Sequence, residues 1–493
     1  MIRLIFALAL SLAAIDACAA EAPLWLVVGP AELTAAAEQL VRHREAEGMR
    51  AMVANDSIEA ALAAAPVKPA YLLIIGDEDP ANTNATYRVP AQQRELYRWR
   101  LAQATQYASD AAWGDLDGDG APEIPVGRIP ARTPEQVREA CRKIIAYETA
   151  TPTANDLRLL AWAGSANYDP MTDQMANAAV VSMVNASAPA WCQPWLLIGD
   201  PANSFCGWPE RQPACFTEQM KRGSVLTVLI GHAGVSSFSS MSTGGRRVSY
   251  TAEHARRLLG DASQPCAPMI ILACNTGNFA HTSPCMTESF LMIPGGPVAV
   301  IGATTESHPL PNFYTSVALL KALGGKHRRL GDLWLAAQQV SLRARIPLAE
   351  SLLADVEGKL EATINVGKLK RDQILMYALL GDPATRLRLP EKLEASCRRT
   401  DAGWQWQAAV PPDAKAEAGL RSAAPPVGAV AKATNEQEAE QALKSANARY
   451  EFSPTPCTAD GEARIGTVDQ PGILRIIATQ PGKISVATIV VKE

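Results

Sequence analysis

Short runs that are almost entirely apolar recur along the first 390 residues and alternate with amphipathic stretches. The apolar runs are residues 24–28, 71–75, 157–163, 195–198, 225–230, 269–273 and 298–301. A strand without polar alternation is buried on both faces, and helices between such strands predict a mostly parallel sheet covered on both sides. The pattern therefore predicts an α/β fold. In such a sheet the binding crevice lies at the carboxyl ends of the strands.

Helix signals separate the predicted strands. The stretches 31–47 and 171–184 carry apolar residues at helical spacing. Thr133, Pro134 and Gln136 have the spacing of a cap, a first-turn proline and a capping box, so a helix is expected to begin there.

The chain is expected to contain more than one domain, because 493 residues is about three times the usual domain length. With 48% hydrophobic and 19% charged residues it can build a large core, which excludes disorder for most of its length. The predicted units are a leader over 1–20, α/β subdomains over 21–155 and 156–390, and a third domain over 391–493. The third domain has alternating segments with Pro- and Gly-rich turns, typical of a small Ig-like β-sandwich, and a helix is expected at 434–447.

Residues 1–20 have the features of a secretory signal peptide. Arg3 precedes an apolar run over 4–14, and small residues, including Ala19 and Ala20, come before Glu21. A membrane anchor is the alternative, but it needs about 20 apolar residues. We therefore expect an exported protein without a membrane span, located in the periplasm, outside the cell or on its surface.

Several functional classes are disfavoured. The net charge of −4 comes from 46 basic and 50 acidic residues without a basic stripe, so no nucleic-acid partner is expected. No His-Glu-x-x-His zinc motif occurs, no Gly-x-Ser-x-Gly elbow follows a predicted strand, and no phosphate-binding loop follows the first strand. The oligomeric state is left open.

The cysteine count narrows the chemistry. Removing Cys18 with the leader leaves nine of the ten cysteines, an odd number. In an oxidising compartment the unpaired residue is either a buried bystander or a thiol kept free for chemistry. Cys397 and Cys457 both fall in the predicted sandwich and are candidates to bridge its sheets.

A histidine and a cysteine follow two of the predicted strands directly. Strand 225–230 runs into His232 within a Gly-His-Ala-Gly segment, and strand 269–273 runs into Cys274. Either residue alone is more often structural. Together, at the same edge of a parallel sheet, they have the chemistry of a cysteine peptidase, in which an imidazole activates a thiol and later protonates the leaving amine. Glycines beside the histidine allow backbone N–H groups to form an oxyanion hole.

Four stretches in order resemble the gingipain-type cysteine peptidases, whose fold is related to that of caspases and legumains. The stretches lie within 109–130, 231–234, 273–288 and 380–383, and the resemblance covers roughly residues 24–390. It implies a caspase-like α/β fold, peptide or protein substrates and chemistry that needs no cofactor. It also implies that Cys274 is the nucleophile, that His232 is the general base and acid, and that the amides of Gly234 and Cys274 are the oxyanion donors.

The sequence departs from this family at two points. Ala233 follows the histidine directly, where the family usually has glycine. The aromatic wall of the gingipain pocket corresponds to the region of His308, so a preference for Arg or Lys is not transferred. We expect His308 to line the substrate pocket.

An acidic loop precedes the predicted active site. Asp115, Asp117 and Asp119 match the first half of a calcium loop, with Gly120 at the turn and Glu123 as a further oxygen ligand, but position 12 lacks the bidentate Glu. Three interpretations stay open, namely a structural Ca²⁺ site, a plain acidic turn, and a pocket for a basic side chain lined by Asp119 or Glu123.

Asp110, just before this loop, is a candidate to orient His232, with a turn or cap role as the alternative. The sequence as a whole predicts an exported cysteine endopeptidase with a Cys274/His232 dyad. The competing hypothesis is a catalytically degenerate relative that serves binding, adhesion or secretion.

Overall fold

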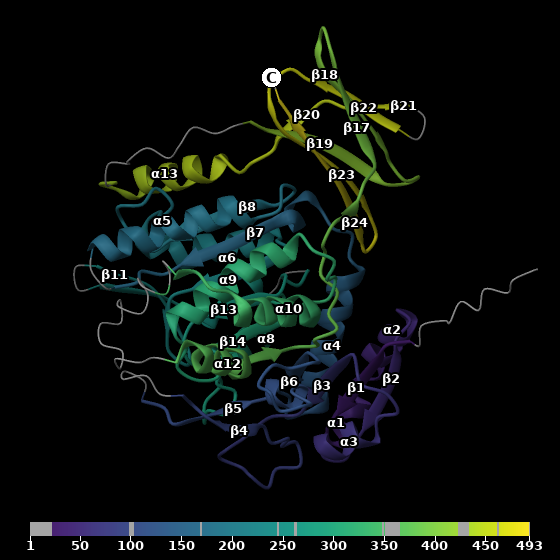
Figure 1. Ribbon diagram of the computed structural model, residues 1–493, viewed down its shortest axis with the longest axis vertical. Helices are drawn as coiled ribbons and strands as arrows, with labels where there is room; N and C mark the ends of the chain where they lie inside the picture. The colour runs from purple at the N-terminus through teal and green to yellow at the C-terminus, as the bar shows by residue number, and fades with distance from the viewer. Residues whose placement is uncertain are drawn as a thin grey trace, which may run out of the picture.

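The computed structural model describes residues 22–97, 103–167, 170–243, 246–260, 264–347, 350, 365–422, 433–460 and 463–492. Most of this chain is built around one sheet of ten strands (Figure 1). In spatial order the strands are β2 (Arg50–Ala54), β1 (Leu24–Val28), β3 (Tyr71–Ile75), β6 (Val126–Ile129), β15 (Tyr377–Leu380), β14 (Val300–Ala303), β13 (Met269–Leu272), β9 (Leu226–Ile230), β7 (Arg158–Ala163) and β8 (Gln193–Ile198). The predicted α/β class with a mostly parallel sheet is confirmed.

The sheet changes direction at one point that the sequence pattern does not reveal. Neighbouring strands are parallel except β14 and β15, which pair antiparallel with Val300 opposite Leu380. The strands of the two halves therefore point in opposite directions. The carboxyl ends of the strands in one half lie beside the amino ends of the strands in the other half. β9 and β13 belong to the same half, so the segments that follow them share one edge.

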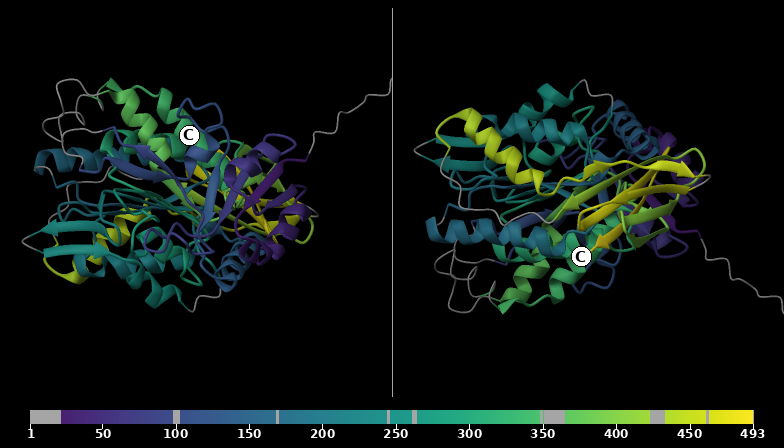
Figure 2. Two further views of the ribbon diagram at one scale, coloured as in Figure 1. Left: turned by 90° about the horizontal axis from the view of Figure 1, so that it is seen from below. Right: turned by 90° about the horizontal axis from the view of Figure 1, so that it is seen from above.

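Helices cover both faces of the sheet (Figure 2). They are α1 (Ala31–Ala35), α2 (Glu38–Ala46), α3 (Ile58–Ala64), α4 (Pro134–Thr149), α5 (Pro170–Ser187), α6 (Gln212–Arg222), α7 (Ala252–Leu259), α8 (Met286–Leu291), α9 (Pro309–Leu323), α10 (Leu330–Arg343) and α12 (Val366–Met376). Short 3-10 helices occur at Ala111–Gly114, Ala154–Leu157 and Pro209–Arg211. The predicted capping box of Thr133 and Gln136 opens α4.

Alternate side chains of each central strand enter different cores. In β7, Leu159 and Ala163 join a core with α9 and α10, whereas Leu160 and Trp162 join a core with α6, α7 and α8. This two-sided burial explains why the strands are apolar throughout. The amino-terminal half has its own two cores, one with α1, α2 and α4 and one with α3.

Two smaller sheets flank the large one. β10 (His232–Ala233), β11 (Phe238–Thr243) and β12 (Arg246–Tyr250) form one, and β4 (Gln92–Glu95) pairs with β5 (Gln106–Ser109) in the other. In the described part of the chain, no helix is both long and apolar enough to cross a bilayer.

The carboxyl-terminal region is a sandwich of two sheets. One sheet has the order β16 (Glu391–Lys392), β24 (Lys483–Val491), β23 (Gly472–Gln480), β19 (Lys415–Ser422) and β20 (Ser453–Thr455). The other has the order β17 (Ala395–Thr400), β18 (Gly403–Ala409), β22 (Ala463–Val468) and β21 (Thr458–Asp460). Trp406 from one sheet and Leu474 from the other lie in a shared core, as the alternating sequence predicted.

The expected bridge between Cys397 and Cys457 is absent from this sandwich. Cys397 lies in β17 and Cys457 directly precedes β21, at opposite edges of the four-stranded sheet. Edge strands three spacings apart are separated by roughly 14 Å, well beyond disulfide reach. Each of the nine cysteines within the described residues is a thiol in this structure.

The predicted helix near 434–447 is α13 (Glu436–Ala448), and it packs away from the sandwich. It lies along α5 and β8 at the far edge of the large sheet (Figure 1). Asn447 donates to the carbonyl of Leu196 and accepts from its amide, at 3.0 and 2.7 Å. A helix that covers a sheet edge in this way prevents pairing with other strands.

Candidate active site

The register of β9 and β13 brings His232 and Cys274 to neighbouring positions. Ile230 is paired with Leu272 in the parallel ladder, and the Gly231 amide donates to the Leu272 carbonyl at 3.3 Å. Each predicted catalytic residue lies two positions beyond its member of this pair. Because adjacent strands run about 4.8 Å apart, both side chains leave the sheet at the same edge from adjacent strands.

His232 is held by a backbone carbonyl. It lies exposed at the start of β10, and its Nε2 is 2.8 Å from the carbonyl oxygen of Ala166, in the loop after β7. A carbonyl only accepts, so Nε2 carries the proton in this contact and the neutral ring has its lone pair on Nδ1. The imidazole is thus oriented with the tautomer of a general base.

Cys274 lies partly exposed at a sharp turn. The next residue, Asn275, has a φ of 60°, and its amide donates to the Thr305 carbonyl at 2.9 Å. A left-handed residue there turns the chain directly after β13. The Cys274 Sγ accepts from the Ser307 amide at 3.4 Å, donates to the Ser307 carbonyl at 3.5 Å and lies 3.8 Å from the Ser307 Oγ.

A buried polar network behind Ser307 was missed by the sequence reasoning. The Asn312 side-chain amide donates to Ser307 Oγ at 3.1 Å, and Asn312 Oδ1 accepts from the Tyr377 hydroxyl at 2.7 Å and from Gln373. Burial raises the pKa of Tyr377, and the nearby Cys274 adds to the rise. These residues come from the loop after β14, from α9, from α12 and from β15. Because they are far apart in the sequence, no local motif predicts that they meet.

The amide of Gly234, a predicted oxyanion donor, has a hydrogen-bond partner within the protein. Its amide donates to the Ser237 carbonyl at 2.9 Å and closes the turn between β10 and β11. A turn bond that uses the only N–H of the residue leaves no donor for a substrate oxygen. The amide of Cys274 stays a prediction for this role.

The side chain of Asp110 binds Arg128, whereas the sequence suggested that it orients His232. Its two carboxylate oxygens accept from Nε and Nη2 of Arg128 at 2.6 and 2.7 Å, and both side chains are buried. The guanidinium of Arg128 also lies over the Phe279 ring, 4.8 Å from its centroid. Asp110 therefore anchors the arginine beneath the loop after Cys274, and the histidine is oriented by Ala166.

His308, which was predicted to line the substrate pocket, is buried at the start of α9. It is 1% exposed, and its Nδ1 accepts from the Leu310 amide at 3.2 Å as the N-cap of α9. Burial lowers the pKa of His308 to about 4, so the ring is neutral at ordinary pH. A helix cap, and not contact with substrate, is the role that this position favours.

The acidic loop gathers its oxygen atoms as a cation site requires. Ligand atoms of Asp115, Asp117, Asp119 and Glu123 all lie within 4.8 Å of one another. Oδ1 of Asp115 is buried without a hydrogen-bond partner, while Oδ2 accepts from the Gly120 amide at 3.0 Å. A set of carboxylate oxygens fits Ca²⁺. A Ca²⁺ site and the role of Asp119 in a basic pocket both stay predictions.

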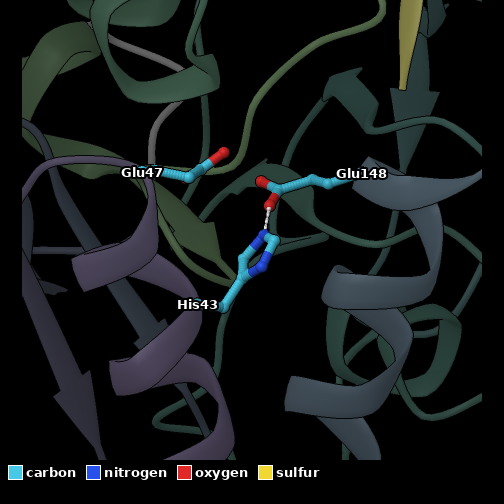
Figure 3. A group of neighbouring side chains, drawn as sticks. All are labelled: His43, Glu47 and Glu148. Carbon is cyan, nitrogen blue, oxygen red and sulfur yellow. Dashed lines mark hydrogen bonds and ion pairs between the residues drawn. The ribbon is translucent and has the colours of Figure 1, made fainter. Parts of the chain in front are cut away.

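A second acidic group occurs where α2 meets α4, at His43, Glu47 and Glu148 (Figure 3). Nε2 of His43 lies 2.5 Å from Glu148, and Arg44 binds the same carboxylate at 2.7 and 3.0 Å. Burial opposes ionisation of Glu148, but these two partners outweigh it and hold its pKa at about 2. The guanidinium neutralises the charge that a metal would need, so the group is a structural junction.

Arg44 also binds Asp382, which belongs to the motif stretch 380–383. Arg44 Nε donates to Asp382 at 2.8 Å, and the Trp25 indole donates to the other oxygen of that carboxylate at 3.1 Å. Asp382 is fully buried. The Leu-Gly-Asp-Pro segment therefore fastens the end of β15 to β1 and α2, far from the dyad.

The chain matches a known peptidase family and a solved structure of the same fold. The model of peptidase family C25 matches residues 19–388. The crystal structure of the Arg-specific cysteine proteinase gingipain R superposes with a TM-score of 0.57 and 14% identity, covering 96% of this chain and 98% of that one.

Two further structures have the same fold. The complex of Porphyromonas gingivalis RgpB pro- and mature domains gives a TM-score of 0.53 at 14% identity, covering 95% of this chain and all of that one. A structure described simply as a protease gives 0.55 at 15% identity, covering 95% of this chain and 97% of that one. No curated protein sequence matches the chain. The family match spans most of the sequence, and the chain therefore belongs to peptidase family C25 and has the fold of the gingipain cysteine proteinases.

Proposed function

We propose that the protein is an exported cysteine endopeptidase in which Cys274 is the nucleophile and His232 the general base and acid. The observation that carries the proposal is the register of Ile230 with Leu272, which aligns the two residues at one edge of adjacent parallel strands. Family membership makes protein or peptide substrates the expected class.

The proposed reaction has two steps. Nδ1 of His232 takes the thiol proton, and the Cys274 sulfur attacks the peptide carbonyl to form an acyl-enzyme, while the imidazolium protonates the leaving amine. Water, activated by the same imidazole, then hydrolyses the thioester. The Ala166 carbonyl holds Nε2–H throughout and stabilises the imidazolium. It thereby also orients the ring, which is the role that the sequence suggested for Asp110. The Cys274 amide is the proposed oxyanion donor.

Labelling with a thiol-reactive peptide electrophile under reducing conditions tests this assignment. We expect the full-length wild type to be labelled at Cys274 and Cys274→Ala to lose the label. Cys215→Ala is the matched control, because burial raises the pKa of the partly exposed Cys215 to about 12 and keeps it a thiol. Equal labelling of wild type and Cys274→Ala would contradict the dyad and favour a degenerate binding protein.

Specificity and location need separate tests. The Arg specificity of gingipain R is not carried over to this chain, because His308 is buried where the family's pocket wall was expected. A fluorogenic peptide library with residues on both sides of the scissile bond measures the preference and tests endopeptidase cleavage. Export predicts that the mature protein outside the cytoplasm begins at Glu21, which amino-terminal sequencing determines.

We also propose that the loop of Asp115, Asp117, Asp119 and Glu123 binds a structural Ca²⁺. The converging oxygen atoms and the unpartnered Asp115 Oδ1 support it. The ion has no role in the proposed reaction steps.

A further inference from the structure

We propose that Ser307 binds the thiolate of Cys274 through both its amide and its hydroxyl, and that Asn312 is the positioning residue that aims this hydroxyl. The proposal rests on Cys274 acting as the nucleophile. It adds a source of thiolate stabilisation that is independent of the imidazole. Its consequence is a lowered pKa of the attacking sulfur before substrate binds.

The donors converge on the sulfur from one residue. The Ser307 amide donates to Sγ at 3.4 Å, and Ser307 Oγ lies 3.8 Å from Sγ, within range for a sulfur acceptor. Ser307 is 5% exposed, so water does not compete freely for these groups. Hydrogen bonds to an ionised acceptor stabilise the charged form and lower its pKa.

The Ser307 hydroxyl has partners besides the sulfur. The Asn312 side-chain N–H donates to Ser307 Oγ at 3.1 Å, which fills an acceptor position of the hydroxyl. A hydroxyl has a single hydrogen, and both the sulfur, 3.8 Å away, and the Tyr377 hydroxyl are partners of this group; we take the hydrogen to point at the sulfur when Cys274 is ionised, because the negative charge is the stronger acceptor. The protonated thiol of Cys274 donates to the Ser307 carbonyl at 3.5 Å. A thiolate can only accept, and we expect the amide and hydroxyl of Ser307 together to outweigh the loss of that bond.

The orientation of Asn312 is fixed in turn by two donors. Its Oδ1 accepts from the Tyr377 hydroxyl at 2.7 Å and from the Gln373 amide. Both donors are 2% exposed, and Asn312 is 5% exposed. Flipping the Asn312 amide alone would set its N–H₂ against the N–H₂ of Gln373, and a buried donor without an acceptor costs free energy. The N–H₂ group is therefore kept on the side of Ser307.

The other charged or titratable groups around Ser307 do not account for this effect. Burial raises the pKa of Tyr377, so it stays neutral, and burial lowers the pKa of His308 to about 4. Glu306 accepts from the amides of Gln103 and Ala104 at 2.7 and 2.9 Å. His232 follows the neighbouring strand and is the proposed partner of the thiol, so it has to be removed to isolate the contribution of Ser307.

The test is the pH dependence of alkylation by iodoacetamide, measured on full-length protein with the His232→Ala substitution. Mass spectrometry of the peptide that carries Cys274 separates this thiol from the other cysteines. We expect Ser307→Ala to raise the midpoint by about one pH unit and to lower the rate about tenfold below the midpoint. Ser307→Thr keeps a hydroxyl, so its midpoint is expected to lie close to that of the protein with Ser307.

Asn312→Asp is a second variant of nearly the same shape. Its carboxylate accepts the Ser307 hydroxyl, draws it from the sulfur and adds negative charge, so the midpoint is expected to rise by at least as much. Ser341→Ala is the matched control, since Ser341 is a buried serine bonded to the Gln338 carbonyl. An unchanged midpoint in folded Ser307→Ala, or in Asn312→Asp if the first variant does not fold, overturns the proposal.

The readout keeps the two proposals apart. Alkylation needs no peptide substrate, so a shifted midpoint in a protein that cleaves no peptide supports the thiolate site and contradicts the peptidase. Peptide cleavage by the wild type together with unmoved midpoints contradicts the thiolate site and leaves the peptidase standing.

Discussion

Asn447 of α13 occupies the place of a missing strand partner for Leu196 at the edge of the large sheet. Its side-chain amide makes both hydrogen bonds that an adjacent strand would make to this residue. The helix belongs in sequence to the carboxyl-terminal region, so this buried side chain is one of the contacts that join the peptidase sheet to that region, beside the hydrogen bonds of Arg421 and Arg475 to the carbonyls of Cys192 and Trp191.

We expect Asn447→Ala to lower the free energy of unfolding by about 2 kcal/mol, because two buried backbone groups lose their partners. Urea denaturation measures the change. Ser445→Ala, on the exposed face of the same helix, is expected to change stability by less than about 0.5 kcal/mol. Size-exclusion chromatography should show self-association of Asn447→Ala if the uncovered edge pairs with another copy.

Arg128→Met is expected to destabilise the fold by about 3–5 kcal/mol, since it leaves the buried Asp110 carboxylate without its cation. Thermal unfolding measures the loss. The double variant Asp110→Asn with Arg128→Met removes both charges and should recover part of it. A double variant no more stable than Arg128→Met would show that packing of the arginine, and not the ion pair, stabilises this region.

Glu148 makes stability depend on acid pH in a defined direction. Its partners lower the folded-state pKa to about 2 from an unfolded value of 4.5. A depressed carboxyl pKa contributes stability that is fully present above the unfolded value and is lost as the pH falls through the folded value. The wild type is therefore expected to lose roughly 3 kcal/mol from this group between about pH 4.5 and pH 2.

Glu148→Gln tests that dependence. The variant should be less stable at neutral pH and show a flatter stability profile through the same acid range, measured by urea denaturation at each pH. A parallel profile for wild type and variant would assign the acid sensitivity to other carboxylates.

Removal of Ca²⁺ is expected to lower the melting temperature of the wild type, with recovery on adding Ca²⁺ but not Mg²⁺, whose small octahedral shell suits a carboxylate loop poorly. Asp117→Asn should abolish the response. Asp401→Asn, in an exposed turn of the sandwich, is the matched control and should respond like the wild type. A calcium response that survives Asp117→Asn would place the ion elsewhere.

Much of the fold follows from local patterns. Runs such as 71–75 form strands because every side chain enters a core on one face or the other, and such runs can be recognised without their neighbours. β15 was not predicted, because four residues carry little periodicity. Its parallel pairing with β6 and antiparallel pairing with β14 joins the two halves into one sheet.

The amino-acid sequence by itself determined the fold class and the two strands that lead into His232 and Cys274. It also placed both residues at the same end of the sheet. These depend on patterns within about ten residues and on the rule that parallel strands end together. The tertiary structure decided the partners of each group. Ala166 binds the histidine, Arg128 binds Asp110, and Ser307 reaches the sulfur through contacts between residues far apart in the chain. Such pairings are set by how the elements pack, and a single sequence carries no local signal for them.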